Sequence, residues 1–169
     1  QESRVAAPRA IEPPSTYAEI KTIPVSGFSP RAVGVLDRDD TVFVANAYGD
    51  DSRWVPANPG NVSIINGRTG TELSGRIRVG GFPSVIEVNQ STSAVYVGIQ
   101  GDSSVAVLDG RQGTSQTVQT SITGFLGPRS MVVNQTDGTL YVANYGTSVS
   151  PSTVSVVNPG TTRFAGTIP

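Results

Sequence analysis

The feature that most constrains the fold of this chain is a threefold internal repeat. In each copy a proline opens an apolar run, as in "SPRAVGVLD", and an aromatic residue follows in a second run, as in "TVFVAN". The two residues are 13 positions apart every time, at Pro30 and Phe43, Pro83 and Tyr96, and Pro128 and Tyr141. A fixed internal spacing of this kind is the sequence signature of a repeat architecture.

Two further apolar runs complete each copy. The third runs are "NVSIIN", "SVAVLD" and "TVSVVN", and the fourth runs contain Ile77, Ile122 and Ile168. Val, Ile and Tyr dominate the runs, and turn residues such as Asp137-Gly138 separate them, which is typical of strands joined by tight turns. The prolines recur after 53 and then 45 residues. Four strands in about 40–50 residues is the length of one propeller blade.

The order of these motifs resembles the YVTN β-propeller repeat family. That family is marked by a Tyr-Val-Thr/Ala-Asn strand, a Thr-Val-Ser-Val-Ile-Asp strand and an Ile-Pro-Val-Gly segment, and "LYVANYG", "TVSVVN" and "IPVSG" are similar here. The resemblance covers roughly residues 18–169, but Gly98 and Ile99 replace the Ala and Asn in the middle copy. It implies a fold more than a function, because such propellers occur in surface-layer and cell-surface proteins, in secreted binding proteins and in relatives of several enzymes.

We therefore expect an all-β protein with three four-stranded blades of a larger β-propeller. The ring is expected to have six to eight blades, most simply seven, because three are too few to close the usual ring of 4–8. The remaining blades are then expected on the same or another chain. The predicted divisions are an extended N-terminal segment at 1–16, an outer strand at 17–29 that completes another blade for ring closure, and blades at 30–79, 80–127 and 128–169.

The composition limits the chemistry that these residues can perform. The 169 residues include no His and no Cys, which excludes Ser/His and Cys/His nucleophile pairs, imidazole and thiolate metal ligands, and disulfides within them. The net charge is −1 and the 12 cationic residues are scattered, so no basic stripe for nucleic acid is present. No apolar run reaches the length of a transmembrane segment. No carboxylate pair recurs in the repeat, so the sequence favours a protein without cofactor, metal or catalysis.

The connection after the second run differs most between the copies. From the aromatic residue to the valine of the third run it spans 19, 9 and 13 residues, and the longest version holds the only Trp. In the propellers that this chain resembles, these loops and the blade-to-blade loops emerge on one face around the central channel, where binding often resides. The resemblance thus implies a ligand- or partner-binding surface formed by Tyr48, Asp50, Asp51, Arg53, Trp54, Arg31, Arg129 and Tyr145.

These residues also have structural interpretations. Trp54 could pack on a neighbouring blade instead of meeting a partner, and the acidic pair Asp50 and Asp51 fits a solvated turn better than a calcium site, because no regular calcium loop is present. Arg31 and Arg129 could hold a carboxylate or phosphate at the channel mouth, or form salt bridges with acidic residues on the same face.

Three functions remain open. The sequence favours a non-catalytic, extracytoplasmic propeller, whether secreted, periplasmic or on the cell surface, that serves as a scaffold and holds a protein or glycan on its loop-bearing face. One alternative is an accessory subunit of a larger assembly. The other is a lyase- or lactonase-type enzyme whose catalytic residues lie in blades not present here. The location rests on the resemblance and on the Pro- and Ala-rich start "QESRVAAPRAIEPPST", which is typical of a processed N-terminus or a spacer.

Overall fold

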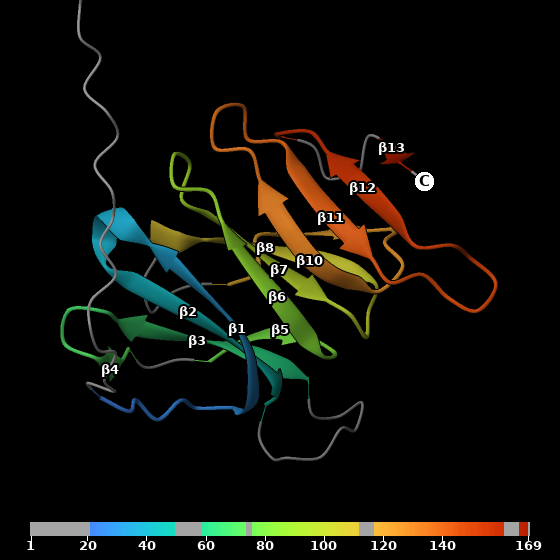
Figure 1. Cartoon of the computed structure of the whole chain (residues 1–169). Coiled ribbons are helices and arrows are strands. Elements are labelled where there is room, and N and C mark those ends of the chain that lie inside the picture. Colours follow the sequence, from blue (N-terminus) through green and yellow to red (C-terminus); the bar gives the residue numbers. More distant parts are fainter. Residues whose placement is uncertain (1–20, 50–58, 74–75, 112–116, 161–165, 169) are drawn as a thin grey trace, which may run out of the picture.

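The three repeats form three separate antiparallel sheets (Figure 1). The computed structural model describes residues 21–49, 59–73, 76–111, 117–160 and 166–168, and no α-helix occurs among them. The first sheet consists of β1 (Phe28–Leu36), β2 (Thr41–Tyr48), β3 (Gly60–Asn66), β4 (Thr71–Glu72) and β5 (Ile77–Gly80). The second consists of β6 (Pro83–Val88), β7 (Ala94–Ile99), β8 (Ser104–Asp109) and β9 (Thr120–Thr123). The third consists of β10 (Pro128–Val133), β11 (Leu140–Asn144), β12 (Thr153–Val157) and β13 (Gly166–Ile168).

We call these sheets blade 1, blade 2 and blade 3. Each strand pairs with the next along the chain, as expected for four apolar runs separated by turns. The first sheet departs from the predicted four strands, because β4 and β5 both pair with β3, one at each end of that strand. A short 3-10 helix, η1 (Asp37–Asp39), connects β1 to β2.

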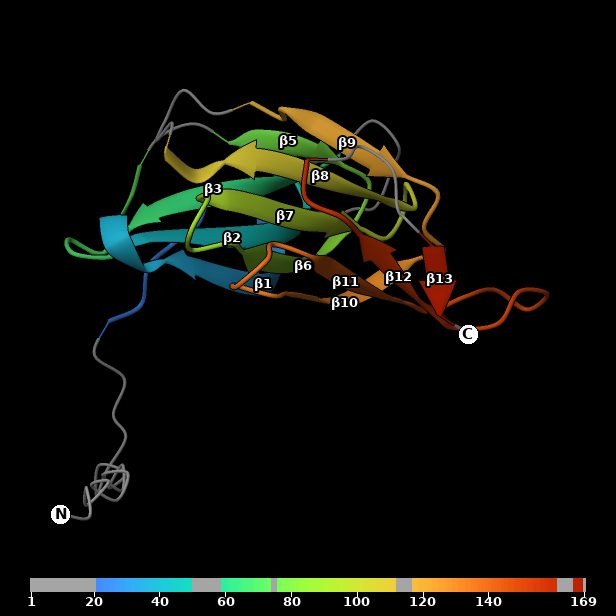
Figure 2. The ribbon, with the colours of Figure 1, turned by 90° about the horizontal axis from the view of Figure 1, so that it is seen from above.

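The blades pack face to face around two apolar cores. The inner strands β1, β6 and β10 gather on one side of the molecule, and β5 and β9 lie on the other (Figure 2). The core between blades 1 and 2 contains Leu36, Phe43, Val62, Ile64, Ile77, Ile86, Val95, Val97 and Leu108. The core between blades 2 and 3 contains Val105, Ile122, Phe125, Met131, Leu140, Val142 and Val157. Blade 2 buries both of its faces, which explains why its runs are apolar without clean alternation.

The Asn of the "VAN" segment in the second strand of blades 1 and 3 holds that strand to the third. Asn46 Nδ2 donates to Asn61 Oδ1 at 2.8 Å and to Ser63 Oγ at 3.0 Å. In blade 3, Asn144 Nδ2 donates to Ser155 Oγ at 2.8 Å, and Asn144 Oδ1 accepts from the amide of Leu126 at 3.4 Å. The Asn of "VAN" and the Ser of the third run are therefore a buried polar pair.

Blade 2 replaces this polar pair with an apolar one. Ile99 stands where the other blades have Asn, and Ala106 stands where they have Ser. Both side chains are 0% exposed and belong to the core between blades 1 and 2. The two replacements go together because a buried Asn without its hydroxyl partner would leave polar groups unsatisfied.

Residues 21–27 run alongside β3 and β4 without forming a strand. The amide and hydroxyl of Ser26 donate to the Glu72 carboxylate at 3.0 and 2.6 Å, and Asn61 Nδ2 donates to the Ser26 carbonyl at 3.2 Å. The sequence predicted an outer strand over 17–29, but a strand needs a sheet edge to pair with, and the described residues include no further sheet for it. Ring closure by this segment stays a prediction.

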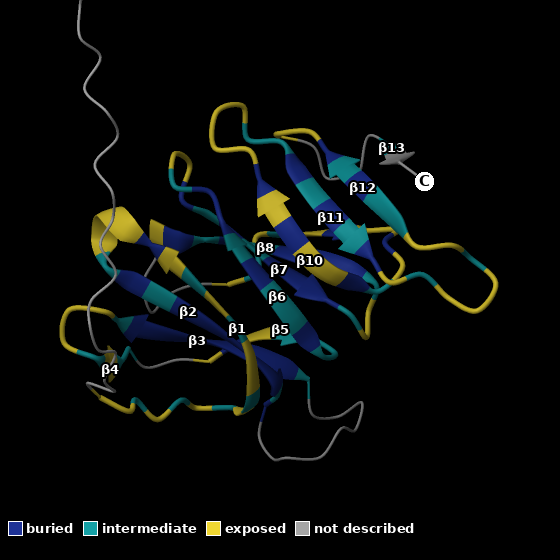
Figure 3. Ribbon diagram, in the orientation of Figure 1, coloured by how far each residue is buried: buried dark blue, intermediate teal, exposed yellow. Residues whose placement is uncertain are grey.

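One face of blade 3 has no sheet packed against it among the described residues. Tyr141 lies opposite Val132 on β10 and opposite Val156 on β12, so the three side chains share this face. Val132 is 58% exposed and Tyr141 is half-buried, whereas Phe43, at the same place in blade 1, is fully buried. Figure 3 shows the contrast between the buried middle strands of blades 1 and 2 and the exposed residues of β10.

Candidate functional site

The start of each inner strand lies beside the end of the second strand of the same blade. Phe28 pairs with Tyr48, Pro83 with Ile99, and Pro128 with Asn144. The loops that enter the inner strands and those that leave the second strands therefore emerge on one face, which we call the loop-bearing face. This is the face that the resemblance assigned to binding.

Each inner strand carries a β-bulge at this face. The strand register shifts between Pro30 and Ala32 in β1, and it shifts at the same place in β6 and β10. The residues in the three bulges are Arg31, Ser84 and Arg129. A bulge turns a side chain away from the alternation of the strand, and bulges are frequent beside functional sites.

Arg31 reaches from its bulge across to blade 2. Its guanidinium carbon lies 5.0 Å from the centre of the Phe82 ring, within the range of a cation–π interaction. The ring of Tyr48 meets the same Phe82 ring edge to face, with centroids 5.9 Å apart. One guanidinium and two aromatic rings thus form a cluster over the boundary between blades 1 and 2.

Arg129 and Ser84 occupy the equivalent bulges. The Arg129 guanidinium carbon lies 5.1 Å from the centre of the Tyr145 ring, and Tyr145 is 67% exposed. Ser84 Oγ donates to the carbonyl of Pro128 in the next blade at 3.0 Å. The bulge residues of blades 1 and 2 therefore both contact the following blade, whereas Arg129 contacts Tyr145 of its own blade.

Phe82 holds an unusual backbone conformation. Its φ angle is 60°, a region that residues with bulky side chains rarely adopt. Its equivalents before the other two prolines, Ser29 and Gly127, have φ angles of 57° and 69°. Gly127 adopts this shape without steric cost, but for an L-residue such as Phe82 the cost is about 1–2 kcal/mol. Strain of this kind is often retained where a side chain must be presented in one position.

Four of the predicted site residues lie on the loop-bearing face and four fall outside the described residues. Arg31, Tyr48, Arg129 and Tyr145 make the contacts given above, and they form two clusters rather than one. The other four predicted residues are Asp50, Asp51, Arg53 and Trp54, all within the segment 50–58 that the structure leaves undescribed.

The arginines of this face are not paired with acidic residues. Within the described ranges, no carboxylate forms a salt bridge with Arg31 or Arg129, and aromatic rings take that place. The described salt bridges Arg38–Asp39, Arg68–Asp40 and Arg111–Asp109 lie in connections at the opposite end of the blades. No group of three or more acidic side chains that could hold a metal ion occurs in the described residues.

Phe82 was missed by sequence reasoning. It precedes Pro83, the proline that the repeat aligns with Pro30 and Pro128. An aromatic residue at a position where another copy has Gly was the signal that could have identified Phe82.

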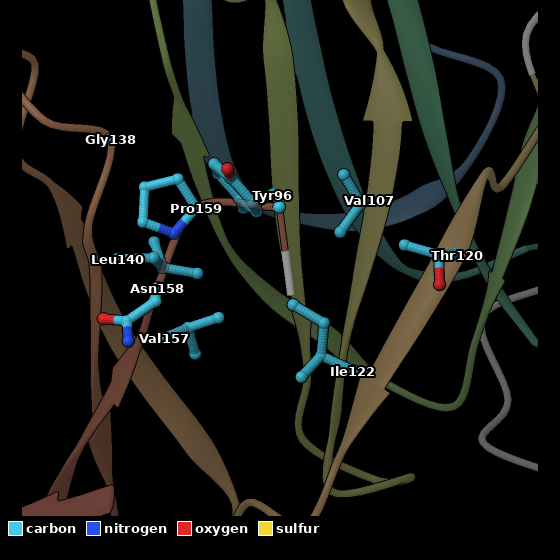
Figure 4. Close-up of a pocket in the computed structure, with 10 residues that line it drawn as sticks. Tyr96, Val107, Thr120, Ile122, Gly138, Leu140, Val157, Asn158 and Pro159 are labelled. Carbon is cyan, nitrogen blue, oxygen red and sulfur yellow. The ribbon is translucent and has the colours of Figure 1, made fainter. Parts of the chain in front are cut away.

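A second candidate site is a cleft between blades 2 and 3, near the opposite face. Tyr96, Val107, Thr120 and Ile122 of blade 2 lie across from Leu140, Val157 and Pro159 of blade 3 (Figure 4). The cleft has a volume of about 230 Å³ and adjoins a second hollow of about 340 Å³ that shares Tyr96, Gly138, Pro159 and Gly160. Burial raises the pKa of the Tyr96 hydroxyl, which therefore stays protonated at neutral pH.

Solved structures with a similar fold are propellers. The chain is similar to Kuenenia stuttgartiensis hydrazine synthase, with 23% identity and a TM-score of 0.67 over 82% of this chain and 36% of that one. It is similar to a chain of the nidogen/laminin complex, with 13% identity and a TM-score of 0.59 over 83% and 47%. It is also similar to the β-propeller domain of Myceliophteria thermophila Cps50 (Swd1), with 10% identity and a TM-score of 0.53 over 76% and 34%.

These similarities establish the fold of the chain as part of a β-propeller. The chain spans between about a third and a half of the length of the structures that it matches. No family model and no curated protein sequence matches it. The described residues include no helix long and apolar enough to cross a membrane.

Proposed function

We propose that this chain belongs to a non-catalytic β-propeller scaffold that binds a carboxylate-bearing protein segment or glycan on its loop-bearing face. The observation that carries the proposal is the pair of exposed arginines, Arg31 and Arg129, each aimed by a bulge and stacked on an aromatic ring. Neither has an acidic partner among the described residues.

The stacked arrangement favours carboxylate ligands for a geometric reason. An aromatic ring occupies the flat face of a guanidinium, while the N–H groups lie in its plane and stay free to donate. A carboxylate accepts two such hydrogen bonds side by side, and charge-assisted bonds of this kind are stronger than neutral ones. The guanidinium carbons of Arg31 and Arg129 lie 5.0 and 5.1 Å from the ring centres, which is compatible with this arrangement.

The fixed position of Arg31 also lowers the cost of binding. A free Arg side chain loses rotamer entropy when a ligand immobilises it, and a side chain that is already held loses less. The bulge and the Phe82 ring hold Arg31 in place, and the Tyr48 ring contacts the Phe82 ring. The positive φ of Phe82 is then a cost that the fold carries in order to place this ring.

We further propose that the protein is a YVTN-type propeller and that it acts outside the cytoplasm, as a secreted, periplasmic or cell-surface protein. The support is the set of motifs that resemble that family. A similar fold occurs in the nidogen/laminin complex, which supports protein binding as one role for such a scaffold. Fractionation of the source cells tests the location.

A second role, as an accessory subunit of a larger assembly, is favoured by the free face of blade 3. Val132, Tyr141 and Val156 lie where blades 1 and 2 bury equivalent residues against the next blade. We propose that a further blade, on the same or another chain, packs there. Nothing in the described residues favours the lyase- or lactonase-type alternative.

Binding to two polyanions of different backbone tests the proposed function. The chain is titrated with poly-L-glutamate and with polygalacturonate at low and moderate salt, and binding is followed by biolayer interferometry. The double variant Arg31→Ala/Arg129→Ala is compared with Arg38→Ala/Arg111→Ala, which removes the same charge from the opposite end of the blades. We expect the first variant to lose at least tenfold in affinity and the second to lose less than threefold, as about 1.5–3 kcal/mol per charged hydrogen bond implies.

The two variants separate a site from a general charge effect. If both lose affinity equally, binding depends on net charge and the proposal fails. If the unsubstituted chain binds neither polymer, the carboxylate specificity is wrong. A preference for one polymer distinguishes an acidic peptide from a uronate glycan as the class of partner.

A further inference from the structure

Two residues that line the cleft between blades 2 and 3 differ from their equivalents in blade 1. The first is Tyr96, which takes the place of the fully buried Phe43 and adds a hydroxyl. The second is Thr120, which pairs with Val107 in the strand register. In blade 1 the amide of Leu73 donates to the carbonyl of Ile64 at the equivalent place, at 2.7 Å, and Leu73 packs against the core between blades 1 and 2. The boundary between blades 2 and 3 thus has two hydroxyl-bearing side chains where blade 1 has apolar ones.

The cleft has the lining of a ligand site. Its walls are the apolar side chains of Val107, Ile122, Leu140 and Val157, with the ring of Pro159 beside Tyr96 (Figure 4). Two hydroxyls, those of Tyr96 and Thr120, also line it, and neither has a hydrogen-bond partner among the described residues. A mainly apolar pocket with a few polar groups is typical of sites for small molecules.

The charges around the cleft disfavour an anion. No acidic or basic side chain lines the cleft itself, so a charged ligand would lose its hydration without a partner. Asp137 lines the adjoining hollow. Hydrogen bonds from the backbone and side chain of Thr139 lower the pKa of Asp137, which keeps its carboxylate ionised at neutral pH. An anion entering through that hollow would be repelled.

We propose that this cleft binds a small uncharged ring compound that carries a hydroxyl group. The volume of about 230 Å³ exceeds that of an engineered cavity of about 150 Å³ that accepts benzene, so one ring with a short polar substituent fits. The ring lies between the apolar walls and its hydroxyl meets that of Tyr96. This site is independent of the loop-bearing face and does not rest on the proposed function.

Titration with benzyl alcohol tests the proposal. The whole chain is titrated with benzyl alcohol, toluene and benzoate, and amide shifts are followed by NMR at Tyr96, Val107 and Leu140, with Phe82 as a reference on the opposite face. We expect saturable shifts at the three cleft residues with benzyl alcohol and none at Phe82. Benzoate is expected to bind at least tenfold more weakly.

Two variants and a matched control locate the site. Tyr96→Phe restores the residue of blade 1 and removes only the hydroxyl, so benzyl alcohol should bind about 3–10-fold more weakly while toluene binds as before. Thr120→Leu introduces a larger apolar side chain, like that of Leu73 in blade 1, into the lining of the cleft and should abolish binding of both. Tyr141→Phe makes the same change as Tyr96→Phe on the free face of blade 3 and should alter neither affinity.

The proposal is overturned by any of three results. Benzyl alcohol shifts that do not saturate, or that appear equally at Phe82, indicate no site. Unchanged affinity for benzyl alcohol in Tyr96→Phe shows that the Tyr96 hydroxyl does not contribute to binding. Full binding in a folded Thr120→Leu variant shows that the ligand binds elsewhere.

Discussion

The guanidinium of Arg31 lies 5.0 Å from the centre of the Phe82 ring, across the boundary between two blades. Arg31 lies in a β-bulge of β1, and Phe82 has a positive φ angle. Both departures from regular strand geometry occur at the loop-bearing face. They place a cation and a ring where a ligand can reach them.

The strain at Phe82 predicts an inverted order of stability for two substitutions. In an ordinary strand position Gly is less stable than Ala by roughly 0.5–1 kcal/mol. At Phe82 we expect Phe82→Gly to be more stable than Phe82→Ala by about 1 kcal/mol, because only Gly adopts this φ freely. Urea denaturation of both variants measures the difference. The usual order, with Ala the more stable, would show that position 82 is not held at positive φ.

The polar pair of blade 3 predicts energetic coupling between Asn144 and Ser155. Asn144→Ala leaves buried polar groups unpaired and should lower the free energy of unfolding by about 1–3 kcal/mol. The double variant Asn144→Ile/Ser155→Ala copies the apolar pair Ile99 and Ala106 of blade 2. We expect it to cost less than the sum of Asn144→Ile and Ser155→Ala, with a coupling of about 0.5–3 kcal/mol. Strict additivity would argue against the pair.

The aromatic residues of the repeat should differ in their contribution to stability. Phe43 is fully buried between blades 1 and 2, so Phe43→Ala should cost about 3–5 kcal/mol. Tyr141 is half-buried on the free face of blade 3, and Tyr141→Ala should cost less than half as much in this chain. Chemical denaturation gives both values. Equal losses would mean that the free face of blade 3 is covered in solution.

The contact between Glu72 and Ser26 predicts a pH-dependent anchor for residues 21–27. Burial raises the pKa of Glu72, but hydrogen bonds from Ser26 and Ser63 and the charge of Arg76 outweigh it, so the pKa lies below its ordinary value of 4.5. A lowered folded-state pKa stabilises the folded contact above the unfolded value, and this stabilisation is lost as the pH falls through the folded value.

The amide resonance of Ser26 reports this anchor. It should titrate with a midpoint below 4.5, and the titration should vanish in Glu72→Gln. A midpoint above 4.5 in the unsubstituted chain, or an unaltered titration in Glu72→Gln, would contradict the assignment.

The blades could be predicted from the sequence because their strands pair with neighbours in the chain. The spacing from Pro83 to Tyr96, and the same spacing in the other copies, identifies two adjacent strands and the turn between them. The joint change to Ile99 and Ala106 was visible in part, since Ile99 breaks the "VAN" pattern. Its meaning needed the strand register, which shows that the Ser of the third run changes with it.

The details of the candidate sites could not be predicted in the same way. Arg31 and Phe82 belong to different repeats, and their contact depends on how neighbouring blades pack, although the bulge and the positive φ recur at the proline of all three blades. The cleft at Tyr96 has Thr120 at the place where blade 1 has Leu73, which becomes visible only when the strand register aligns the two positions. The loop with Trp54 lies outside the described residues, and its role stays a prediction.

The most direct test of the central claim is a hydrogen–deuterium exchange footprint with poly-L-glutamate or polygalacturonate bound. We predict slower exchange in peptides that cover residues 28–31, 82–84 and 126–129, which form the loop-bearing face. Peptides that cover residues 89–93 and 134–138, at the opposite end of the blades, should exchange as in the free chain. Protection confined to 89–93 and 134–138, or spread evenly over both ends, would contradict the account.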